Sequence, residues 1–331
     1  FPLILSIRAV APALAAGNTV VLKPDPHTPI TGGYLIARVF EEAGLPKDCL
    51  QVLPGGADVG QAMCADPNIA MISFTGSTAA GRSVGEQAGR TLKKVTLELG
   101  GKNRLVILDD ADVDLAASCA AWGAYLHQGQ ICMTTGVILV HERIAAKVTD
   151  LLAGKAAHLP VGDPATQQVA LGPLINARQR DRVHGIVQDS IKQGARLAAG
   201  GTYEGNFYKP TVLTNVQPGM RCFEEEVFGP VASVVSFSTE DEAVDLANRT
   251  EYGLSLGVIS ASTSRALSLA ARIPTGLLHI NDQTVADEPH IPFGGRGASG
   301  NGGRHGGPAN WEEFTQWQWV TIKDSAPRYP F

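Results

Sequence analysis

The sequence lacks long apolar runs, and it also lacks long runs of like charge. Because no apolar stretch approaches the roughly 20 residues that a helix needs to cross a bilayer, we expect no membrane partner. The opening residues 1–18 have too short an apolar part for a signal peptide. Lysine and arginine total 27 against 32 acidic residues, and the net charge is −5. Without a basic patch to neutralise phosphates, the chain is not expected to bind nucleic acid.

Cysteine is scarce, and its spacing carries no metal-binding pattern. None of the five cysteines forms a CxxC or CxxH pair, so we predict no zinc site and no other metal site. An odd number of widely separated cysteines also argues against a disulfide framework and favours reduced thiols in the cytoplasm. The cysteines are Cys49, Cys64, Cys119, Cys132 and Cys222.

The chain is nevertheless well supplied with core-forming residues. Its 331 residues are 44% hydrophobic and 18% charged, which suits one large domain or two. Short strand-like runs alternate with segments of helical spacing: a strand at 19–24 precedes a helix at 30–46, and a strand at 70–74 precedes a helix at 78–89. This alternation predicts an α/β fold with a mostly parallel, doubly wound sheet.

The end of the chain has a different pattern. In TQWQWVTIK, residues 315–323, the side chains of Trp317, Trp319 and Thr321 share one side of an extended segment. We predict a terminal strand whose exposed tryptophans favour pairing with another chain.

One cysteine lies in an unusual setting. Cys132 is part of QGQICMTTG, a polar stretch flanked by glycine, whereas Cys119 lies in the apolar run AASCAAW. A buried thiol in an apolar helix acts as a small hydrophobic group, and Cys119 fits that role. Cys132 does not, and we treat it as a candidate reactive thiol.

A second stretch suits an anion. FTGSTAAG, residues 74–81, places Gly76 and Ser77 between a strand and a helix, where free N–H groups and the helix dipole can hold a phosphate. The stretch is neither a P-loop nor a GxGxxG motif. The alternative reading is a simple turn in which the serine caps the helix.

Two carboxylates and a glycine-rich loop complete the candidates. Glu98 in LELGGKN ends a strand, at the sheet edge where α/β proteins bind ligands, although a solvated strand end is the alternative. Glu226 and Phe228 in EEVFGP share one side of an extended segment, although a surface acidic cluster with a core phenylalanine would look the same. The loop at 292–303, PFGGRGASGNGG, is suited to a close backbone approach or to movement.

Together and in this order, these stretches resemble the aldehyde dehydrogenase superfamily over the whole chain. The shared motifs are VVLKP, FTGS, LELGGKN, GQIC, EEVFGP and PFGG. A nearer resemblance, to dehydrogenases of aromatic aldehydes such as benzaldehyde, rests on stretches such as LKPDP, LHQGQICM and RQRDRVHGIV. The resemblance implies part of a Rossmann-like NAD(P)-binding domain at 1–99, a catalytic domain at 100–298, and a return segment with an oligomerisation strand at 299–331.

The resemblance also implies the chemistry. Cys132 matches the family's nucleophile, whose thiolate attacks the aldehyde carbon to form a thiohemiacetal; loss of hydride to a nicotinamide then leaves a thioester. Glu98 matches the general base, which activates the water that releases a carboxylic acid. The other four cysteines match no such position.

Cofactor residues follow from the same motifs. Lys23 matches the lysine that holds the adenosine ribose, Gly76 and Ser77 lie where the pyrophosphate meets the helix, Glu226 would bind the nicotinamide ribose, and Phe228 would pack near it.

The cofactor's identity is left open by one departure from the family pattern. NAD-preferring members often carry a glutamate where this chain has Pro26. We favour NAD over NADP because of the nearer subgroup, and because Asp25 would weakly oppose a 2′-phosphate.

The substrate pocket implied by the resemblance is aromatic and apolar, which suits a flat ring, and it has no cation to select a carboxylated semialdehyde. His127 is interpreted as a polar wall residue, since Glu98 already supplies the base. The predicted pocket residues are Trp122, Tyr125, His127, Ile131, Met133 and Phe293.

Other expectations concern the whole protein. In the family a Trp-Asn pair directly precedes the Phe-Pro that opens this sequence, and that asparagine donates a hydrogen bond to the oxyanion. We therefore expect the chain to be the C-terminal two-thirds of an enzyme, inactive and poorly stable alone.

The tail implies a homodimer or homotetramer. The alternatives are a coenzyme A-acylating or semialdehyde dehydrogenase, the former opposed by Glu98, and a truncated pseudo-enzyme with a structural or binding role.

Overall fold

The computed structural model describes all 331 residues, and the chain forms two compact units. One unit contains Phe1–Gly60 and His305–Phe331, and the other contains Gln61–Arg304. The functional boundary at residue 99 that the resemblance implies is not tested by this division and stays a prediction.

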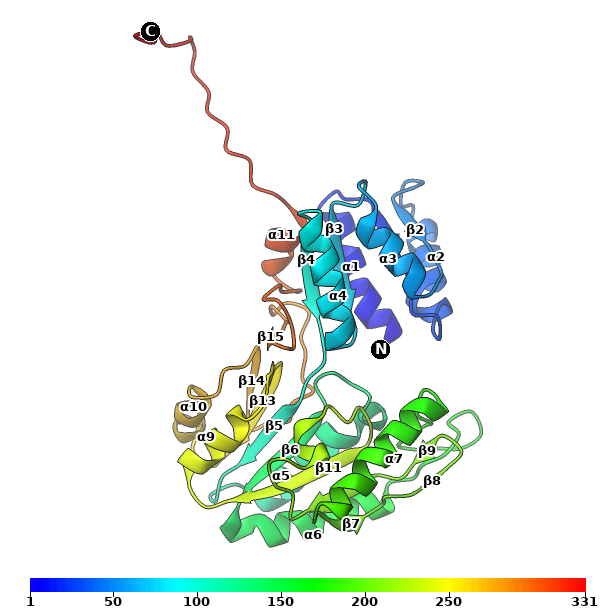
Figure 1. Cartoon of the computed structure of the whole chain (residues 1–331), viewed down its shortest axis with the longest axis vertical. Coiled ribbons are helices and arrows are strands. Elements are labelled where there is room, and N and C mark those ends of the chain that lie inside the picture. Colours follow the sequence, from blue (N-terminus) through cyan, green and yellow to red (C-terminus); the bar gives the residue numbers. More distant parts are fainter. The chain divides into compact units, whose positions relative to one another are not determined.

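The first unit combines helices with a small parallel sheet. The predicted strand at 19–24 forms β1 and pairs with β2, so that Val21 lies opposite Gln51. The predicted helix at 30–46 begins as a π-helical segment before it becomes α-helical. Figure 1 labels the α-helical part as α2. The elements are α1 (Pro2–Ala15), β1 (Val20–Leu22), η1 (Ile30–Tyr34), α2 (Leu35–Glu42), β2 (Leu50–Val52) and α11 (Ala309–Phe314), with α3 (Ala57–Ala65) crossing the boundary.

The second unit begins with a strand, a helix and a strand that carry two of the candidate motifs. These are β3 (Met71–Thr75), α4 (Thr78–Arg90) and β4 (Lys94–Glu98), in which the two strands pair in parallel and Thr75 lies opposite Glu98. FTGS therefore ends one strand beside the residue that ends the other.

The rest of this unit is built on a seven-stranded sheet of order β14-β13-β5-β6-β11-β10-β7. Only β7 is antiparallel to its neighbour, so the predicted mostly parallel sheet is confirmed. The sheet strands are β5 (Asn103–Ile107), β6 (Thr135–His141), β7 (Arg196–Ala199), β10 (Thr211–Thr214), β11 (Val231–Phe237), β13 (Ser255–Ile259) and β14 (Leu277–Ile280). Two short antiparallel pairs lie outside this sheet: β8 (Tyr203–Glu204) with β9 (Phe207–Tyr208), and β12 (Tyr252–Gly253) with β15 (Arg296–Gly297).

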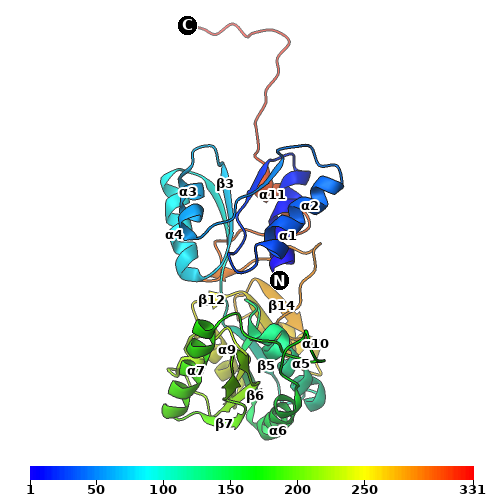
Figure 2. The same ribbon diagram turned by 90° about the vertical axis from the view of Figure 1, so that its right-hand side faces the viewer.

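Helices cover both faces of this sheet (Figure 2). On one face lie α5 (Val113–Tyr125) and α6 (Glu142–His158), and on the other lie α7 (Ala177–Lys192), α9 (Glu240–Asn248) and α10 (Thr263–Ala270). The short helix α8 (Arg221–Glu224) lies beside α7, and the 3₁₀ segment η2 (Leu126–Gly129) follows α5.

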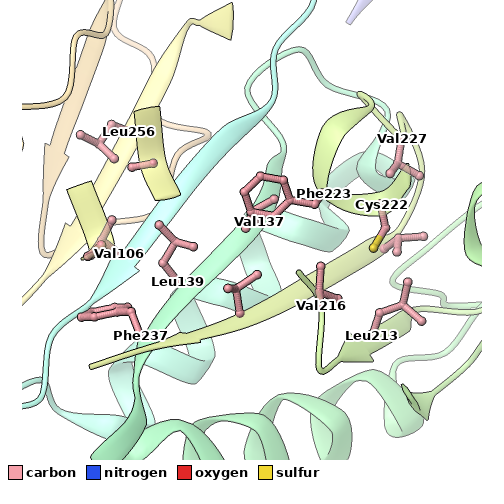
Figure 3. Packing of buried hydrophobic residues seen from close by; sticks show 14 of the residues in the cluster. Val106, Val137, Leu139, Leu213, Val216, Cys222, Phe223, Val227, Phe237 and Leu256 are labelled. Carbon is pink, nitrogen blue, oxygen red and sulfur yellow. The ribbon is translucent and has the colours of Figure 1, made fainter. Parts of the chain in front are cut away.

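Two apolar layers result from the alternation of side chains along the strands. Leu105 and Ile107 point into one layer, whereas Val106 and Leu108 point into the other. Figure 3 shows part of the second layer, where Val106 lies among side chains from β6 and β11. Because β5 is buried on both faces, its residues 105–107 are apolar without polar alternation.

The predicted terminal strand at 315–323 does not form in the single chain. No residue beyond α11 belongs to a strand, and Trp317 and Trp319 are 90% and 91% exposed. A strand needs a neighbouring backbone with which to exchange hydrogen bonds, and this segment has none within its own chain. Separately, no helix in the structure is long and apolar enough to span a membrane.

Candidate active site

Cys132 lies in a tightly turned loop between α5 and β6. The loop begins in η2, where His127, Gln128 and Gly129 have φ angles of 49°, 58° and 66°. Such left-handed geometry is rare for residues with a Cβ and persists where the surroundings enforce it. Cys132 follows at an intermediate exposure and forms no disulfide. The glycine-flanked setting noted in the sequence thus corresponds to a sharply turned chain.

The cysteine loop is held by side chains from other strands and loops. The Asn103 amide donates to the carbonyl oxygens of Cys132 and Thr134, each at 2.8 Å, and accepts a hydrogen bond from the Ser255 N–H at 3.0 Å. The Thr284 hydroxyl donates to the Met133 carbonyl oxygen at 2.6 Å. The backbone that carries the thiol is therefore bound at Cys132 and at the two residues that follow it.

Gly100 and Gly101 lie where this loop and Glu226 approach the backbone too closely for a side chain. A Cβ on Gly101 would lie 2.4 Å from the Cys132 carbonyl oxygen, and a Cβ on Gly100 would lie 2.4 Å from Glu226 Oε2. Both distances are far below van der Waals contact, so no larger residue fits without movement. The double glycine of LELGGKN therefore allows both the Cys132 backbone and the Glu226 carboxylate to approach one backbone segment.

Glu98 is buried at the end of β4, with 6% of its surface exposed. Its carbonyl oxygen accepts a hydrogen bond from the Gly76 N–H at 3.0 Å, and its backbone bridges to Gly300. A Cβ on Gly300 would lie 2.7 Å from the Leu97 carbonyl oxygen, so the glycine-rich loop makes the close approach that its composition predicts. The predicted base is thus fixed between the FTGS turn and this loop.

The FTGS turn has the geometry expected of a helix start. Ser77 is the N-cap of α4, and its hydroxyl oxygen accepts a hydrogen bond from the Ala80 N–H at 3.3 Å. This contact satisfies the capping interpretation. The phosphate-binding role of Gly76 and Ser77 stays a prediction.

Glu226 and Phe228 lie in the segment that connects α8 to β11. Glu226 Oε1 accepts a hydrogen bond from the Gly101 N–H at 3.0 Å, and burial raises the pKa of its carboxyl group. Phe228 has a φ of 53°, again in the left-handed region. The parity argument from the sequence assumed an extended backbone, which this angle does not provide.

The predicted substrate residues separate into two groups. Ile131, Met133 and Phe293 form a buried cluster with Leu254, and Cys132 packs against it. Leu254 has no signal in the sequence, since it lies far along the chain in an ordinary apolar stretch. A buried apolar cluster therefore lies beside the thiol, and the assignment of Ile131, Met133 and Phe293 to a substrate pocket stays a prediction.

The other predicted pocket residues lie differently. Tyr125 belongs to the core layer that α5 forms with the sheet, and its hydroxyl donates to the Thr211 carbonyl oxygen at 3.3 Å. It therefore does not share the cluster beside Cys132, because the chain reverses direction after α5. Trp122 is 56% exposed on the same helix, and burial lowers the pKa of His127 in the loop.

In the first unit, Lys23 and Asp25 each have local partners. The Lys23 ammonium donates to the carbonyl oxygens of Pro24 at 2.9 Å and Gly55 at 3.1 Å. The Asp25 carboxylate contacts the His27 N–H at 2.8 Å and its ring at 2.9 Å. Partial burial opposes ionisation of Asp25, but these hydrogen bonds lower its pKa overall. Asp25 therefore carries a negative charge at neutral pH.

Comparison with known proteins adds the decisive observation. Residues 1–320 match the aldehyde dehydrogenase family. The chain belongs to this family. The predicted family and α/β fold are thereby confirmed. The match runs from the first residue to residue 320, within the tail segment 315–323.

Among aldehyde dehydrogenases, the chain is similar to enzymes named for aromatic substrates. It is 60% identical over 331 residues to a vanillin dehydrogenase of Amycolatopsis sp., covering 100% of this chain and 68% of that protein. It is 54% identical, with the same coverage, to a benzaldehyde dehydrogenase (NAD(+)) of Pseudomonas putida. A salicylaldehyde dehydrogenase of Pseudomonas putida G7, solved with salicylaldehyde, superposes with a TM-score of 0.95 at 38% identity and covers 99% of this chain and 68% of that one. The chain thus spans about two thirds of the length of these relatives.

Several residues of this aldehyde dehydrogenase contact the site but were not predicted from the sequence as site residues. Asn103 and Thr284 hold the cysteine loop, and Gln179 and Arg182 of α7 contact the backbone at 226–228. Their side chains are ordinary surface or core types, so composition offers no signal. A cavity of about 320 Å³ elsewhere in this unit, lined by residues that include Arg104 and Tyr252, contains none of the predicted catalytic residues.

The first prediction concerns Gly101→Ala. The added methyl group would collide with the Cys132 carbonyl oxygen, so the nucleophile loop must shift. Since small misplacements of reacting groups can cost about a hundredfold in rate, we expect kcat/KM for the aldehyde to fall by about that factor. The matched control is Gly154→Ala in α6, where nothing lies within 4 Å of the new Cβ. Equal activity of the two variants would contradict the prediction.

The second prediction concerns the buried Lys102. Its ammonium donates to the carbonyl oxygens of Cys222 at 2.7 Å and Gly136 at 3.3 Å, and burial lowers its pKa from 10.5 to about 7. Between these two pH values the unfolded chain binds a proton that the native state lacks, so native stability rises with pH there. Below about pH 7 the lysine is protonated in both states and this slope disappears.

Urea unfolding across that pH window measures the effect. We compare the free energies of unfolding of the parent protein and of Lys102→Met. As the pH rises through this window, the parent value minus the variant value should increase by up to about 1.4 kcal/mol per pH unit. The variant removes the titrating group but keeps an apolar side chain of similar length. If the two proteins show the same pH dependence, Lys102 does not titrate in this window.

Proposed function

We propose that this aldehyde dehydrogenase oxidises a benzaldehyde-like aromatic aldehyde to its carboxylic acid, with NAD as cofactor. The observation that carries the proposal is the contact of Cys132 with the buried cluster of Ile131, Met133, Leu254 and Phe293. An apolar surface beside the nucleophile suits a flat ring. The names of the vanillin, benzaldehyde and salicylaldehyde dehydrogenases that the chain resembles support the same substrate class.

In the proposed mechanism the Cys132 thiolate attacks the aldehyde carbon and forms a carbon–sulfur bond. The aldehyde oxygen becomes an oxyanion as the carbon becomes tetrahedral. A nicotinamide cofactor held by Glu226 and Phe228 would supply the hydride acceptor. Loss of hydride, which removes two electrons from the substrate, leaves a thioester on Cys132. Glu98 removes a proton from water, the hydroxide adds to the thioester, and the thiolate leaves with the carboxylic acid as product.

The cofactor residues are proposed on the basis of their places in the fold. Gly76 and the N-cap Ser77 immediately precede α4, a helix of 13 residues whose N-terminus favours a pyrophosphate. Glu226 offers a carboxylate suited to ribose hydroxyl groups, with Phe228 beside it. In the first unit Lys23 would contact the adenosine ribose, and the charge on Asp25 favours NAD, because a 2′-phosphate would be repelled.

The proposal is tested with the protein prepared with its predicted upstream region. Reduction of NAD and of NADP is followed separately with benzaldehyde, a vanillin-like aldehyde and an aliphatic aldehyde. We expect NAD and the aromatic aldehydes to give the higher kcat/KM. A higher value with the aliphatic aldehyde would contradict the substrate class, and a product formed only with added coenzyme A would contradict hydrolysis by Glu98.

We further propose a cytoplasmic homodimer or homotetramer. All five cysteines are free, as a reducing compartment requires, and the tail exposes Trp317 and Trp319. Residues 315–323 would form their strand by pairing with a second copy. A chain that ends at Phe314 should then sediment as a smaller species than the complete chain, and equal sedimentation of the two would exclude this role of the tail.

A further inference from the structure

Two side chains of α7 bind the backbone of the segment that carries Glu226 and Phe228. The Gln179 amide nitrogen donates to the carbonyl oxygens of Val227 at 3.2 Å and Phe228 at 2.8 Å. The Arg182 guanidinium donates through Nη1 to the Val227 carbonyl oxygen at 3.0 Å and through Nη2 to that of Glu226 at 2.8 Å. Three successive carbonyl groups thus accept four hydrogen bonds from one face of a helix.

These bonds satisfy a segment whose backbone is unusual. Phe228 has a φ of 53°, which a residue with a Cβ adopts only where its surroundings enforce it. Because residues 226–228 belong to neither a helix nor a strand, their carbonyl groups have no regular backbone partners. The two α7 side chains supply the donors, and they do so at the residues that precede and include the strained position.

Packing continues from α7 through this segment to the cysteine loop. A Cβ on Gly229 would lie 2.5 Å from Cγ2 of Val183, so α7 is in tight contact with the backbone immediately after Phe228. A Cβ on Gly129 would lie 2.2 Å from the Gly229 carbonyl oxygen. The backbone of the nucleophile loop is therefore packed directly against the segment that α7 holds.

The helix itself is well anchored for this role. At its start, the Asn176 side chain accepts a hydrogen bond from the Gln179 N–H at 2.9 Å, which fixes the first turn. The Arg182 guanidinium also lies 3.5 Å from the Glu225 carboxylate, so its charge is paired. Gln179 and Arg182 lie three residues apart and hence on neighbouring positions of one helical face.

We propose that Gln179 and Arg182 are positioning residues that hold Glu226 and Phe228 in place for the nicotinamide end of the cofactor. The inference rests on the proposed function, because that function assigns the cofactor to Glu226 and Phe228. Neither α7 residue needs to touch the reacting atoms. Their role is to keep the carboxylate directed to the Gly101 N–H and to hold the Phe228 backbone in its left-handed conformation.

The test compares Gln179→Glu and Arg182→Met with the parent protein, each prepared with the upstream region. A carboxylate at position 179 has nearly the same shape but no donor, and methionine at 182 keeps an apolar stem without the guanidinium. Since removal of a hydrogen bond to a site of this kind costs about tenfold in binding, we expect the Kd for NAD by calorimetry to rise by about that factor or more. The KM for the aldehyde should be unchanged, and Arg182→Lys, which keeps a donor, should recover part of the loss.

A cofactor-free reaction separates positioning from general damage. Hydrolysis of p-nitrophenyl acetate requires a nucleophilic thiol but no nicotinamide, so its rate should be the same in the parent and the variants. The matched control is Arg180→Met, on the same helix, because Arg180 donates to the Gly205 carbonyl oxygen and contacts Asp181 instead. That control should leave both NAD binding and ester hydrolysis unchanged.

The outcomes are distinguishable. Variants that bind NAD as tightly as the parent overturn the positioning role and leave the proposed function intact. Variants that lose ester hydrolysis in parallel with NAD binding also overturn it, because α7 would then merely support the fold. A parent protein that binds neither NAD nor NADP overturns the proposed function, and the inference with it.

Discussion

Replacement of Cys132 by alanine is expected to abolish aldehyde oxidation. Every later step in the proposed mechanism proceeds through a carbon–sulfur bond, so without the thiol there is neither hydride loss nor a thioester. Removal of the nucleophile in another covalent enzyme costs on the order of a millionfold in kcat, and a loss of that size would leave only background rates here. The measurement is steady-state reduction of NAD with benzaldehyde.

The matched control for this variant is Cys119→Ala. Cys119 is 9% exposed in the core layer beneath α5, where its thiol acts as a small apolar group. Its replacement should leave kcat close to that of the parent. Oxidation that persists in Cys132→Ala, or that disappears equally in Cys119→Ala, would show that Cys132 is not the nucleophile.

Replacement of Glu98 by glutamine is expected to divide the reaction into its two halves. Attack by Cys132 and loss of hydride do not need Glu98, so the first turnover should still reduce one equivalent of NAD. Hydrolysis of the thioester needs a base, and its loss should lower the steady-state rate by about 10² to 10⁴. The variant should therefore show a burst followed by very slow turnover, with the acyl group trapped on Cys132 and detectable by mass spectrometry.

Glutamine is the informative substitution because it keeps the shape of the buried side chain. The backbone of Glu98 is held by the Gly76 N–H and by the bridge to Gly300, and these contacts do not involve the carboxylate. Loss of the burst together with steady-state turnover would place Glu98 in the first half-reaction, and unchanged turnover would exclude it as the base.

Local pattern was sufficient for most of the secondary structure. The strand at 70–74 and the helix at 78–89 appear as β3 and α4 with bounds shifted by one residue, since β-branched runs and a serine cap act within a few residues of sequence. The tail at 315–323 shows where local pattern fails. Its alternation is suited to a strand, but a strand also needs a neighbouring backbone, and none in this chain pairs with the segment.

The residues of the candidate site also differ in whether adjacent sequence could reveal them. Cys132 and Glu98 were identified from short motifs, because glycine-flanked turns and strand ends leave a signature in adjacent residues. Leu254 beside the thiol and Gln179 beside Phe228 left none, since each reaches the site from a distant element. Tyr125, which the family resemblance places in the pocket, lies in the core layer under α5 with its hydroxyl on the Thr211 carbonyl oxygen, and its place in the pocket stays a prediction.

The sequence by itself determined the family and the α/β class, and it predicted the reacting residues, because these depend on motifs, periodicity and side-chain chemistry found in adjacent positions. The tertiary structure alone decided what holds those residues. Asn103 binds the backbone at Cys132, Gly101 separates that loop from Glu226, and α7 holds the carbonyl groups of 226–228. Such contacts arise only when strands and helices far apart in the chain pack together, since hydrogen bonds and steric exclusion act over a few ångströms in space and not along the sequence.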